Sequence, residues 1–334
     1  MGEVVIRMLA VVAALCLLPA APAWAAPDDE RPQRLFTFKD AGITESSGLA
    51  VSPTRDDVYY THNDSADTPT FYAVDGGGRT LGTFQVRGAE ARDWEAMAAT
   101  RDPESGRGVL WFADIGDNLD GAWPDISVYK VMEPRTLGDA TLPATRYRFR
   151  YADGARNAEG VMVHPRTGRL YVVSKEFAGS VYAAPKRLRA DRVNVLRKVA
   201  NAPLMATDAA YAPDGSSYVI RTYFSATLYR PSGEQITRVT MPELEQAESI
   251  TYTRDGSALL TGSEGARSPV YRVPLPAAAR PSPTPTPTPT PVEEESTPVA
   301  ASRSAGLTAN DVLIWLAAAV AAIGVITFLA RRTR

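Results

Sequence analysis

The sequence predicts an all-β fold, a five-bladed β-propeller closed by an N-terminal strand, followed by a Pro/Thr-rich stalk and one transmembrane helix. Two observations support this prediction. Between residues 30 and 278, one order of strand-like runs and polar turns recurs five times. The fifth repeat lacks its fourth strand, whereas an unassigned strand-like run at 35–38 precedes the first repeat. Pairing these two pieces closes the ring and removes free sheet edges, which promote aggregation.

Each repeat contains the same recognisable parts. Pro, Asp and Gly residues mark a hairpin turn at 53–56, 103–106, 165–168, 213–215 and 254–256. The second strands are expected at 58–60, 109–112, 170–173, 218–220 and 258–260. The third strands carry Tyr72, Tyr129, Tyr182, Tyr229 and Tyr271. Fourth strands are expected at 82–86, 146–151, 193–199 and 236–241. A β-sandwich of irregular strands is the alternative, but it does not explain five Tyr residues in register.

The first 25 residues have the features of a secretory signal peptide. Arg7 supplies a positive charge, residues 8–18 form an apolar run, and residues 23–25 read Ala-Trp-Ala, a small-x-small cleavage pattern. A permanent N-terminal anchor is the alternative, although the apolar run is short for a bilayer. The single cysteine, Cys16, lies in this segment, and Leu15 before it disfavours lipidation. A disulfide framework and a multi-Cys zinc site are therefore excluded, and the mature chain is expected to lack thiol chemistry.

The C-terminal end predicts a stalk and a membrane anchor. Residues 279–311 include an alternating Pro-Thr/Ser tract, which favours extended polyproline II. Residues 312–330 form an uninterrupted apolar segment long enough to span a bilayer. Three Arg residues in the tail, 331–334, place that tail in the cytoplasm by the positive-inside bias. We therefore expect a single-pass plasma-membrane protein whose N-terminal ectodomain, residues 30–278, lies outside the cell.

Composition limits the function classes. The chain has 334 residues, a length that by itself suggests two domains, but removal of the ends leaves one folded domain. A net charge of −2 argues against nucleic-acid binding, which needs a basic face. We expect the ectodomain to be monomeric and its partner to be a small anionic ligand or a surface partner.

One polar residue lies at the start of each innermost strand, and together these residues form a column. Its members are Ser47, Glu95, Glu159, Asp208 and Glu248. Carboxylates converging on the axis of a propeller would repel one another, and at least one would have a raised pKa. Ca²⁺, which accepts six to eight oxygen ligands in flexible geometry, would remove that cost. The alternative is that these acids accept hydrogen bonds from neighbouring backbone amides.

The loops after the second strands supply a second column on the same face. His62, Lys175 and Arg221 are the candidate catalytic residues if the protein is an enzyme. His62 titrates near neutral pH, whereas Arg221 and Lys175 suit a phosphate or carboxylate. The remaining candidate ligand-binding residues are Asn63, Asp64, Trp94, Glu176, Tyr223 and Glu264. The competing interpretation is that surface loops are polar in any case, and that Trp94 packs between blades.

A second, local calcium site is a weaker prediction. Asp114, Asp117 and Asn118 lie in one short acidic loop that resembles a calcium loop. The loop lacks the twelfth-position Glu of an EF-hand. An Asp-rich Asx-turn is the competing interpretation.

Several short strings together resemble a group of bacterial secreted propellers described as phytase-like, esterase-like or WD-type repeat proteins. These strings are ESSGL, HNDS, DWE, DIGDN, an acidic AE pair and a closing SEG. A weaker similarity is to the five-bladed calcium-activated apyrases, in which a ring of Ser and Glu holds calcium. That resemblance implies the same five-membered ring as above, with Asp208 as a departure from it. It implies the metal but not the nucleotidase activity, because the nucleotide-contacting residues have no counterparts here.

Two functions follow from these features. The first is a ligand-binding or sensing module for a small anionic ligand, displayed on a membrane-anchored stalk with calcium in its central funnel. The second is a calcium-dependent hydrolase of phosphoesters or other esters, in which the metal polarises the substrate oxygen. In that mechanism His62 would transfer protons, and Lys175 and Arg221 would stabilise developing charge. A purely structural surface protein is the remaining alternative.

Overall fold

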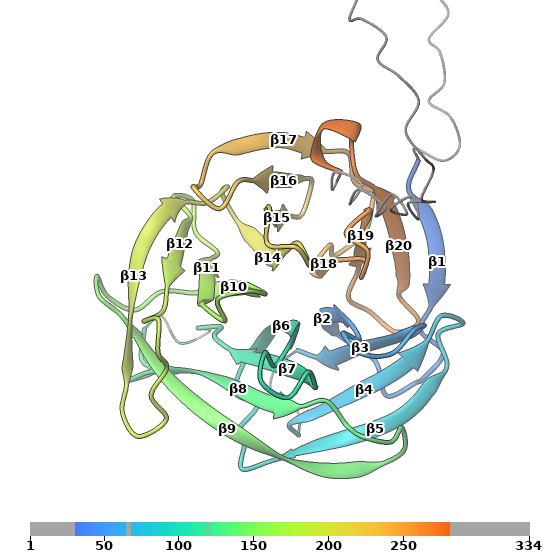
Figure 1. Ribbon diagram of the computed structural model, residues 1–334, viewed down its shortest axis with the longest axis horizontal. Helices are drawn as coiled ribbons and strands as arrows, with labels where there is room; N and C mark the ends of the chain where they lie inside the picture. The colour runs from blue at the N-terminus through green and yellow to red at the C-terminus, as the bar shows by residue number, and fades with distance from the viewer. Residues whose placement is uncertain (1–30, 65–67, 118, 120, 281–334) are drawn as a thin grey trace, which may run out of the picture. The chain divides into compact units, whose positions relative to one another are not determined.

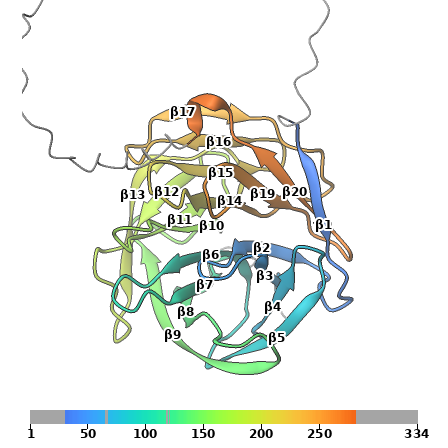
Figure 2. The ribbon, with the colours of Figure 1, turned by 45° about the vertical axis from the view of Figure 1, so that its right-hand side comes forward.

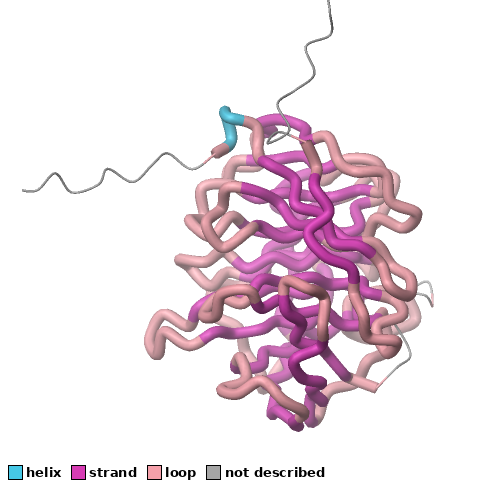
Figure 3. Tube along the Cα trace, turned by 90° about the vertical axis from the view of Figure 1, so that its right-hand side faces the viewer, coloured by secondary structure: helices cyan, strands magenta, loops and turns pink. Residues whose placement is uncertain are grey.

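The computed structural model describes residues 31–64, 68–117, 119 and 121–280. This part of the chain is all-β and has a propeller-like fold, in which strand units surround a common centre (Figure 1). Its one helical element is a 3-10 turn at Ala277–Ala279. In the side view, strands cross the middle of the domain and loops lie on both sides (Figure 3). Residues that the sequence predicts to form the signal peptide, most of the stalk, the transmembrane helix and the tail lie outside the described residues.

The strands form antiparallel units of four. The first unit contains β2 (Ser46–Val51), β3 (Val58–Asn63), β4 (Thr70–Asp75) and β5 (Thr80–Arg87). The second contains β6 (Trp94–Arg101), β7 (Gly108–Asp114), β8 (Ile126–Met132) and β9 (Ala140–Tyr151). The third contains β10 (Ala158–Val163), β11 (Leu170–Ser174), β12 (Ser180–Ala183) and β13 (Asn194–Asn201). The fourth contains β14 (Ala206–Tyr211), β15 (Tyr218–Thr222), β16 (Ala226–Tyr229) and β17 (Gln235–Val239). The last contains β18 (Ile250–Tyr252), β19 (Ala258–Gly262), β20 (Pro269–Pro274) and β1 (Gln33–Thr37).

The N-terminal strand β1 completes the last unit. It pairs antiparallel with β20, with Thr37 opposite Pro269 and Gln33 opposite Arg272. The first strands of successive units, β2, β6, β10, β14 and β18, each contact the next, and β18 also contacts β2. At one end of these strands lies a cavity of about 360 Å³, to which all the units contribute residues.

The outer strands differ from the sequence prediction in one respect. The fourth strand of the second unit, β9, has 12 residues and begins at Ala140, whereas we expected it at 146–151. Its first part pairs parallel with β5 and its last part pairs parallel with β13, so β9 runs along the outside from one neighbour to the other (Figures 1 and 2). These additional pairs join the first three units into one 12-stranded sheet. A repeat pattern cannot reveal such pairing because it lies between repeats.

The hydrophobic core fills the space between neighbouring units. Phe71, Phe84 and Phe112 are fully buried, and Phe71 stacks on Phe84 at a centroid distance of 4.9 Å. Tyr129 and Tyr182, from the predicted Tyr series, are also fully buried. Burial of a side chain of this size contributes about 1.5–3 kcal/mol. Over the residues that the structure describes, no helix is long and apolar enough to cross a membrane.

Candidate functional site

A β-bulge recurs near the start of the first strand in four units. The strand register shifts between Ser46 and Gly48 in β2 and at the matching places in β6, β10 and β14. The residues that are skipped in the strand pairing at these shifts are Ser47, Glu95, Glu159 and Thr207. A bulge re-aims a side chain, and bulges are common next to functional sites. The predicted column therefore exists, but its fourth-unit member is Thr207 and not Asp208.

Asp208 has a structural role that differs from the predicted one. Its carboxylate accepts hydrogen bonds from the backbone N–H of Ala209 at 2.7 Å and of Ile250 at 2.8 Å. These bonds use both carboxylate oxygens and link β14 to β18. Burial raises the pKa of Asp208 despite the two amide donors, which act in the opposite direction. The prediction of Asp208 as a metal ligand is corrected to the alternative, a carboxylate that binds backbone amides.

A repeated backbone hydrogen bond positions the loops that follow the second strands. The backbone N–H of Asp64 donates to Glu45 O at 2.9 Å, and that of Lys175 donates to Asn157 O at 3.0 Å. The N–H of Glu264 makes the matching bond, also at 3.0 Å, to Gln246 O. Each acceptor lies two residues before a member of the central column. Asp64, Lys175 and Glu264 are thus held beside that column, as the sequence predicts for one shared face.

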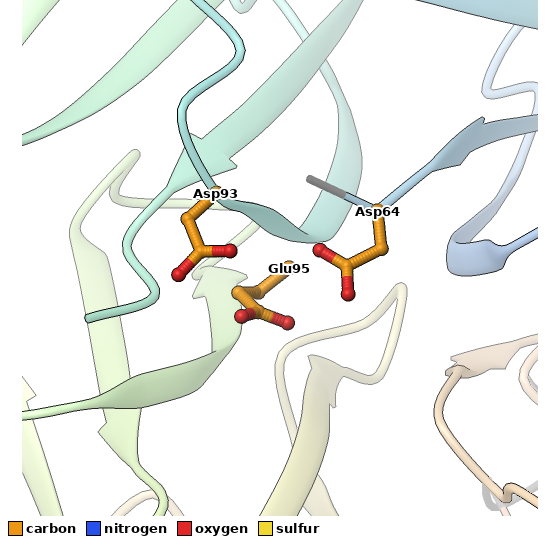
Figure 4. A group of neighbouring side chains, drawn as sticks. All are labelled: Asp64, Asp93 and Glu95. Carbon is orange, nitrogen blue, oxygen red and sulfur yellow. The ribbon is translucent and has the colours of Figure 1, made fainter. Parts of the chain in front are cut away.

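Three carboxylates form a compact group, which we call the carboxylate cluster. It consists of Asp64, Asp93 and Glu95, whose ligand atoms all lie within 4.8 Å of one another, and Figure 4 shows them pointing toward one another. Asp64 follows β3, Asp93 precedes β6, and Glu95 lies at the bulge of β6. Burial is the largest cause of the raised pKa of Glu95, and the charge of Glu159 and then those of Asp64 and Asp93 raise it further.

The carboxylate cluster differs from the metal ring that the sequence predicts. Only Glu95 belongs to both, and Ser47 instead donates from its hydroxyl to the backbone oxygen of Glu95 at 2.7 Å. Asp64 was expected as a ligand-binding residue, and Asp93 was not among the candidates. The signal for Asp93 was its place in the DWE string, two residues before Glu95. Regular strand alternation does not apply there because the bulge begins at Trp94.

Residues of the DIGDN string position the cluster. A Cβ atom on Gly116 would lie 2.5 Å from Cγ of Asp93 and would also meet the carboxylate of Glu95. Asp114 accepts hydrogen bonds at 2.9 Å from the backbone N–H of Asp93 and from Nε of Arg92. Both oxygens of Asp114 thus help to hold the segment before β6 in place, and its part in a second calcium site stays a prediction.

Asp117, another member of that second site, has a buried Oδ1 without a hydrogen-bond partner among the described residues. The backbone N–H of Asp117 donates to Asn157 Oδ1 at 2.9 Å, which joins this loop to the third unit. The predicted ligand Asn118 lies outside the described residues. The second calcium site therefore stays a prediction.

Lys175 is the cation that the structure places beside the acids. Its Nζ forms an ion pair with Glu159 Oε1 and donates a hydrogen bond of 2.7 Å to the hydroxyl of Tyr223. Burial raises the pKa of Glu159, and Lys175 opposes that shift. Burial also raises the pKa of Glu248, and Lys175 again opposes the shift. The remaining oxygen of Glu159, Oε2, is buried and has no hydrogen-bond partner among the described residues.

Glu264 lies at the edge of the same charged group. Its Oε2 accepts a hydrogen bond of 2.7 Å from Gln246 Nε2. Burial raises the pKa of Glu264 to about 7, and the charges of Glu248 and Asp64 contribute in the same direction. Acids of four units therefore influence one another at this end of the domain.

His62 does not occupy the position that its predicted catalytic role requires. Its ring is fully buried, packs edge-on to Trp94 at 5.5 Å, and has Nδ1 2.9 Å from Asn63 O. Burial lowers its pKa to about 4, so it is neutral at pH 7. Gly48 lies directly against the ring, with no room for a Cβ atom. His62 is thus a core residue, and its role as general acid or base is corrected accordingly.

Arg221 and Trp94 are also core residues. Arg221 lies within β15 opposite Asp208, is fully buried, and has no hydrogen-bond partner for its guanidinium among the described residues. Burial lowers the pKa of Arg221 to about 10, against the effect of Glu248 and Asp208. Trp94 stacks on Phe112 at 5.0 Å. Both side chains are buried in this structure, and their predicted roles in ligand binding or catalysis stay predictions.

Two further predicted ligand-binding residues hold loops in place. Asn63 Oδ1 accepts backbone hydrogen bonds from Thr44 at 3.1 Å and from Glu45 at 3.2 Å. Glu176 accepts hydrogen bonds of 3.1 and 3.2 Å from Arg156 Nη1. The polar groups of both residues are engaged within the protein, and their roles in ligand binding stay predictions.

Comparisons with known proteins give a structural likeness but no match to a family. No family model matches this chain, and no curated protein matches it. Among solved structures, the chain is similar to XC5397 of Xanthomonas campestris, a gluconolactonase important in glucose secondary metabolic pathways. The TM-score is 0.46 and the identity is 15%, over 78% of this chain and 99% of that chain.

Proposed function

We propose that this chain is a closed five-bladed propeller that binds Ca²⁺ at the carboxylate cluster and, through the ion and Lys175, a small anionic ligand. The observation that carries this proposal is the approach of the carboxylates of Asp64, Asp93 and Glu95 to within 4.8 Å of one another. Closure is supported by the pairing of β1 with β20 and by the contact of β18 with β2.

The donor set fits a hard cation. All three side chains offer carboxylate oxygens, which Ca²⁺ and Mg²⁺ prefer over nitrogen or sulfur. Without a cation the three charges repel one another, in line with the raised pKa of Glu95. The cluster comes from a loop and from a bulged strand, an irregular arrangement that suits Ca²⁺ better than octahedral Mg²⁺. Three carboxylates leave positions in a six- to eight-coordinate shell that oxygens of an anionic ligand can fill.

Hydrolysis of phosphoesters or other esters is a second candidate function. The observation that favours it is the hydrogen bond between Lys175 Nζ and the Tyr223 hydroxyl beside the cluster. Both groups are donors that can stabilise negative charge on a substrate oxygen. A bound cation would supply polarisation of that oxygen. His62 and Arg221 have no part in this proposal because both are buried in the core.

Calorimetric titration of the purified protein tests the binding proposal. We expect Ca²⁺ to bind at one site and the Glu95→Gln variant to bind it at least tenfold more weakly. Titration with inorganic phosphate and acetate, with and without Ca²⁺, should show binding only when Ca²⁺ is present. Equal Ca²⁺ affinity in the two proteins would overturn the proposal. Turnover across a panel of phosphoesters and esters, lost in Lys175→Met, would favour the hydrolase.

We also propose that the domain is displayed outside the cell by its C-terminal segment. The support is the apolar sequence 312–330 with the basic tail that follows it, both outside the described residues. Membrane fractionation and protease treatment of intact cells test this proposal. Recovery of the full-length chain in the soluble fraction would overturn it.

A further inference from the structure

Large apolar side chains are exposed together on the third and fourth units. We call Phe177, Val199, Leu204 and Phe224 the apolar patch. Phe177 is 88% exposed, Phe224 92% and Leu204 57%. Single exposed apolar residues are ordinary, but a contiguous group of them usually marks a binding surface.

Backbone hydrogen bonds bring the members of the patch together. The N–H of Met205 donates to Glu176 O at 2.9 Å, and the N–H of Ala202 donates to Gly179 O at 2.8 Å. The loop that carries Phe177 therefore lies beside the loop that carries Leu204. Val199, Leu204 and Phe224 line one cavity of about 750 Å³, whose wall also contains Met205 and Tyr229 and the polar residues Asn201, Gln235 and Arg238. This volume is typical of a pocket for a small molecule.

The cavity and the charged site have Tyr223 in common. This residue lines the cavity, and its hydroxyl accepts the hydrogen bond from Lys175 Nζ at 2.7 Å. The ammonium group also lies 5.0 Å from the centre of the Tyr223 ring. A ligand that reaches Lys175 with a polar end would therefore find apolar side chains next to that end.

We propose that the cavity binds the apolar chain of a small single-chain amphiphile whose anionic head lies at Lys175 and the cation. This inference rests on the proposed function for the head and on the apolar patch for the chain. An oxyanion head complements Lys175 and a bound cation, both of which are positive. The exposed Phe and Leu side chains would lose contact with water when the chain enters, which favours binding in proportion to the area covered.

A series of alkyl phosphates of increasing chain length, used as monomers in Ca²⁺, tests this inference by calorimetry. We expect affinity to rise about fourfold for each added methylene until the cavity is filled. Phe224→Ser and Leu204→Ser should flatten this dependence and leave the binding of inorganic phosphate unchanged. Leu35→Ser is the matched control, because Leu35 is an exposed apolar residue on β1, outside the cavity. It should keep the wild-type dependence.

Failure of this inference is distinguishable from failure of the proposed function. If Ca²⁺ and inorganic phosphate bind but chain length has no effect, the amphiphile inference is wrong and the metal site stands. If affinity depends on chain length without any Ca²⁺ binding, the cavity is supported and the metal site is wrong. Binding to anionic phospholipid vesicles, with no affinity for monomeric alkyl phosphates, would overturn the inference in favour of a membrane surface.

Discussion

Replacement of Gly116 by alanine tests whether the carboxylate cluster is a preformed cation site. The added Cβ atom would lie 2.5 Å from Cγ of Asp93, and it would also meet the carboxylate of Glu95. Two non-bonded carbon atoms prefer a separation of about 3.5–4.0 Å. At least one carboxylate must therefore move by about 1 Å.

A movement of that size is large for a metal ligand. Ca²⁺–oxygen distances fall within about 2.3–2.6 Å, and ligand positions in working sites vary by only about 0.2 Å. The variant should lose one of its three carboxylate ligands or hold it poorly. Changes beside metal ligands cost about 10- to 100-fold in affinity, and we expect a loss in that range for Gly116→Ala.

Calorimetric titration with Ca²⁺ measures this loss, and circular dichroism checks that the variant is folded. Gly77→Ala is the control, because Gly77 lies in an exposed turn where the added Cβ would lie 3.2 Å from Oδ1 of Asp75, which is not part of the carboxylate cluster. The control should bind Ca²⁺ as the wild type does. Wild-type affinity in folded Gly116→Ala would refute the reasoning, because the carboxylates would then not need their present positions.

Further changes at the site have distinct expected outcomes. Glu95→Gln should raise the metal-free free energy of unfolding at pH 7, measured in urea, because it removes a buried carboxyl whose charged form is disfavoured by burial and by the neighbouring acids. Lys175→Met should lower it by about 3 kcal/mol at pH 8, because Glu159 loses its partner, and the added change Glu159→Gln should restore most of that loss. The metal-free protein should lose stability as the pH rises from about 4.3 to 7, because the folded pKa of Glu264, about 7, lies above its unfolded value. Ca²⁺ should flatten this pH dependence. A rise in stability over the same pH range would contradict the prediction. His62→Ala should lower stability by about 3 kcal/mol, and unchanged Ca²⁺ affinity would separate this core residue from the site.

The repeat pattern was sufficient to predict the propeller-like fold, because each repeat has to bury its own strands against its neighbours. The run at 35–38 predicted a strand that pairs with the last unit, and β1 does pair with β20. The length of β9 was not predictable in the same way. Its first residues, from Ala140, pair with a strand of the preceding unit, a contact that no pattern within one repeat records.

The site was predicted only in part because side-chain direction depends on local backbone geometry. The column of Ser47, Glu95 and Glu159 was found because each residue sits at the same bulge. In the fourth unit the bulge leaves Thr207 at this place, one residue before Asp208. An offset of one residue reverses the side of the strand. Asp208 consequently points to backbone amides. Its spacing in the sequence had instead predicted a carboxylate in the central column.

The placement of the cations determines how an anion can bind. Three cations were expected around the funnel, but His62 is a buried ring and Arg221 is buried opposite Asp208, whereas Lys175 forms an ion pair with Glu159. Lys175 is itself paired with Glu159, so the metal-free site has an excess of negative charge. An oxyanion would be repelled there until a cation occupies the carboxylate cluster. Binding of the anion and of Ca²⁺ should therefore be coupled, and thermodynamic linkage requires each ligand to raise the affinity of the other by the same factor.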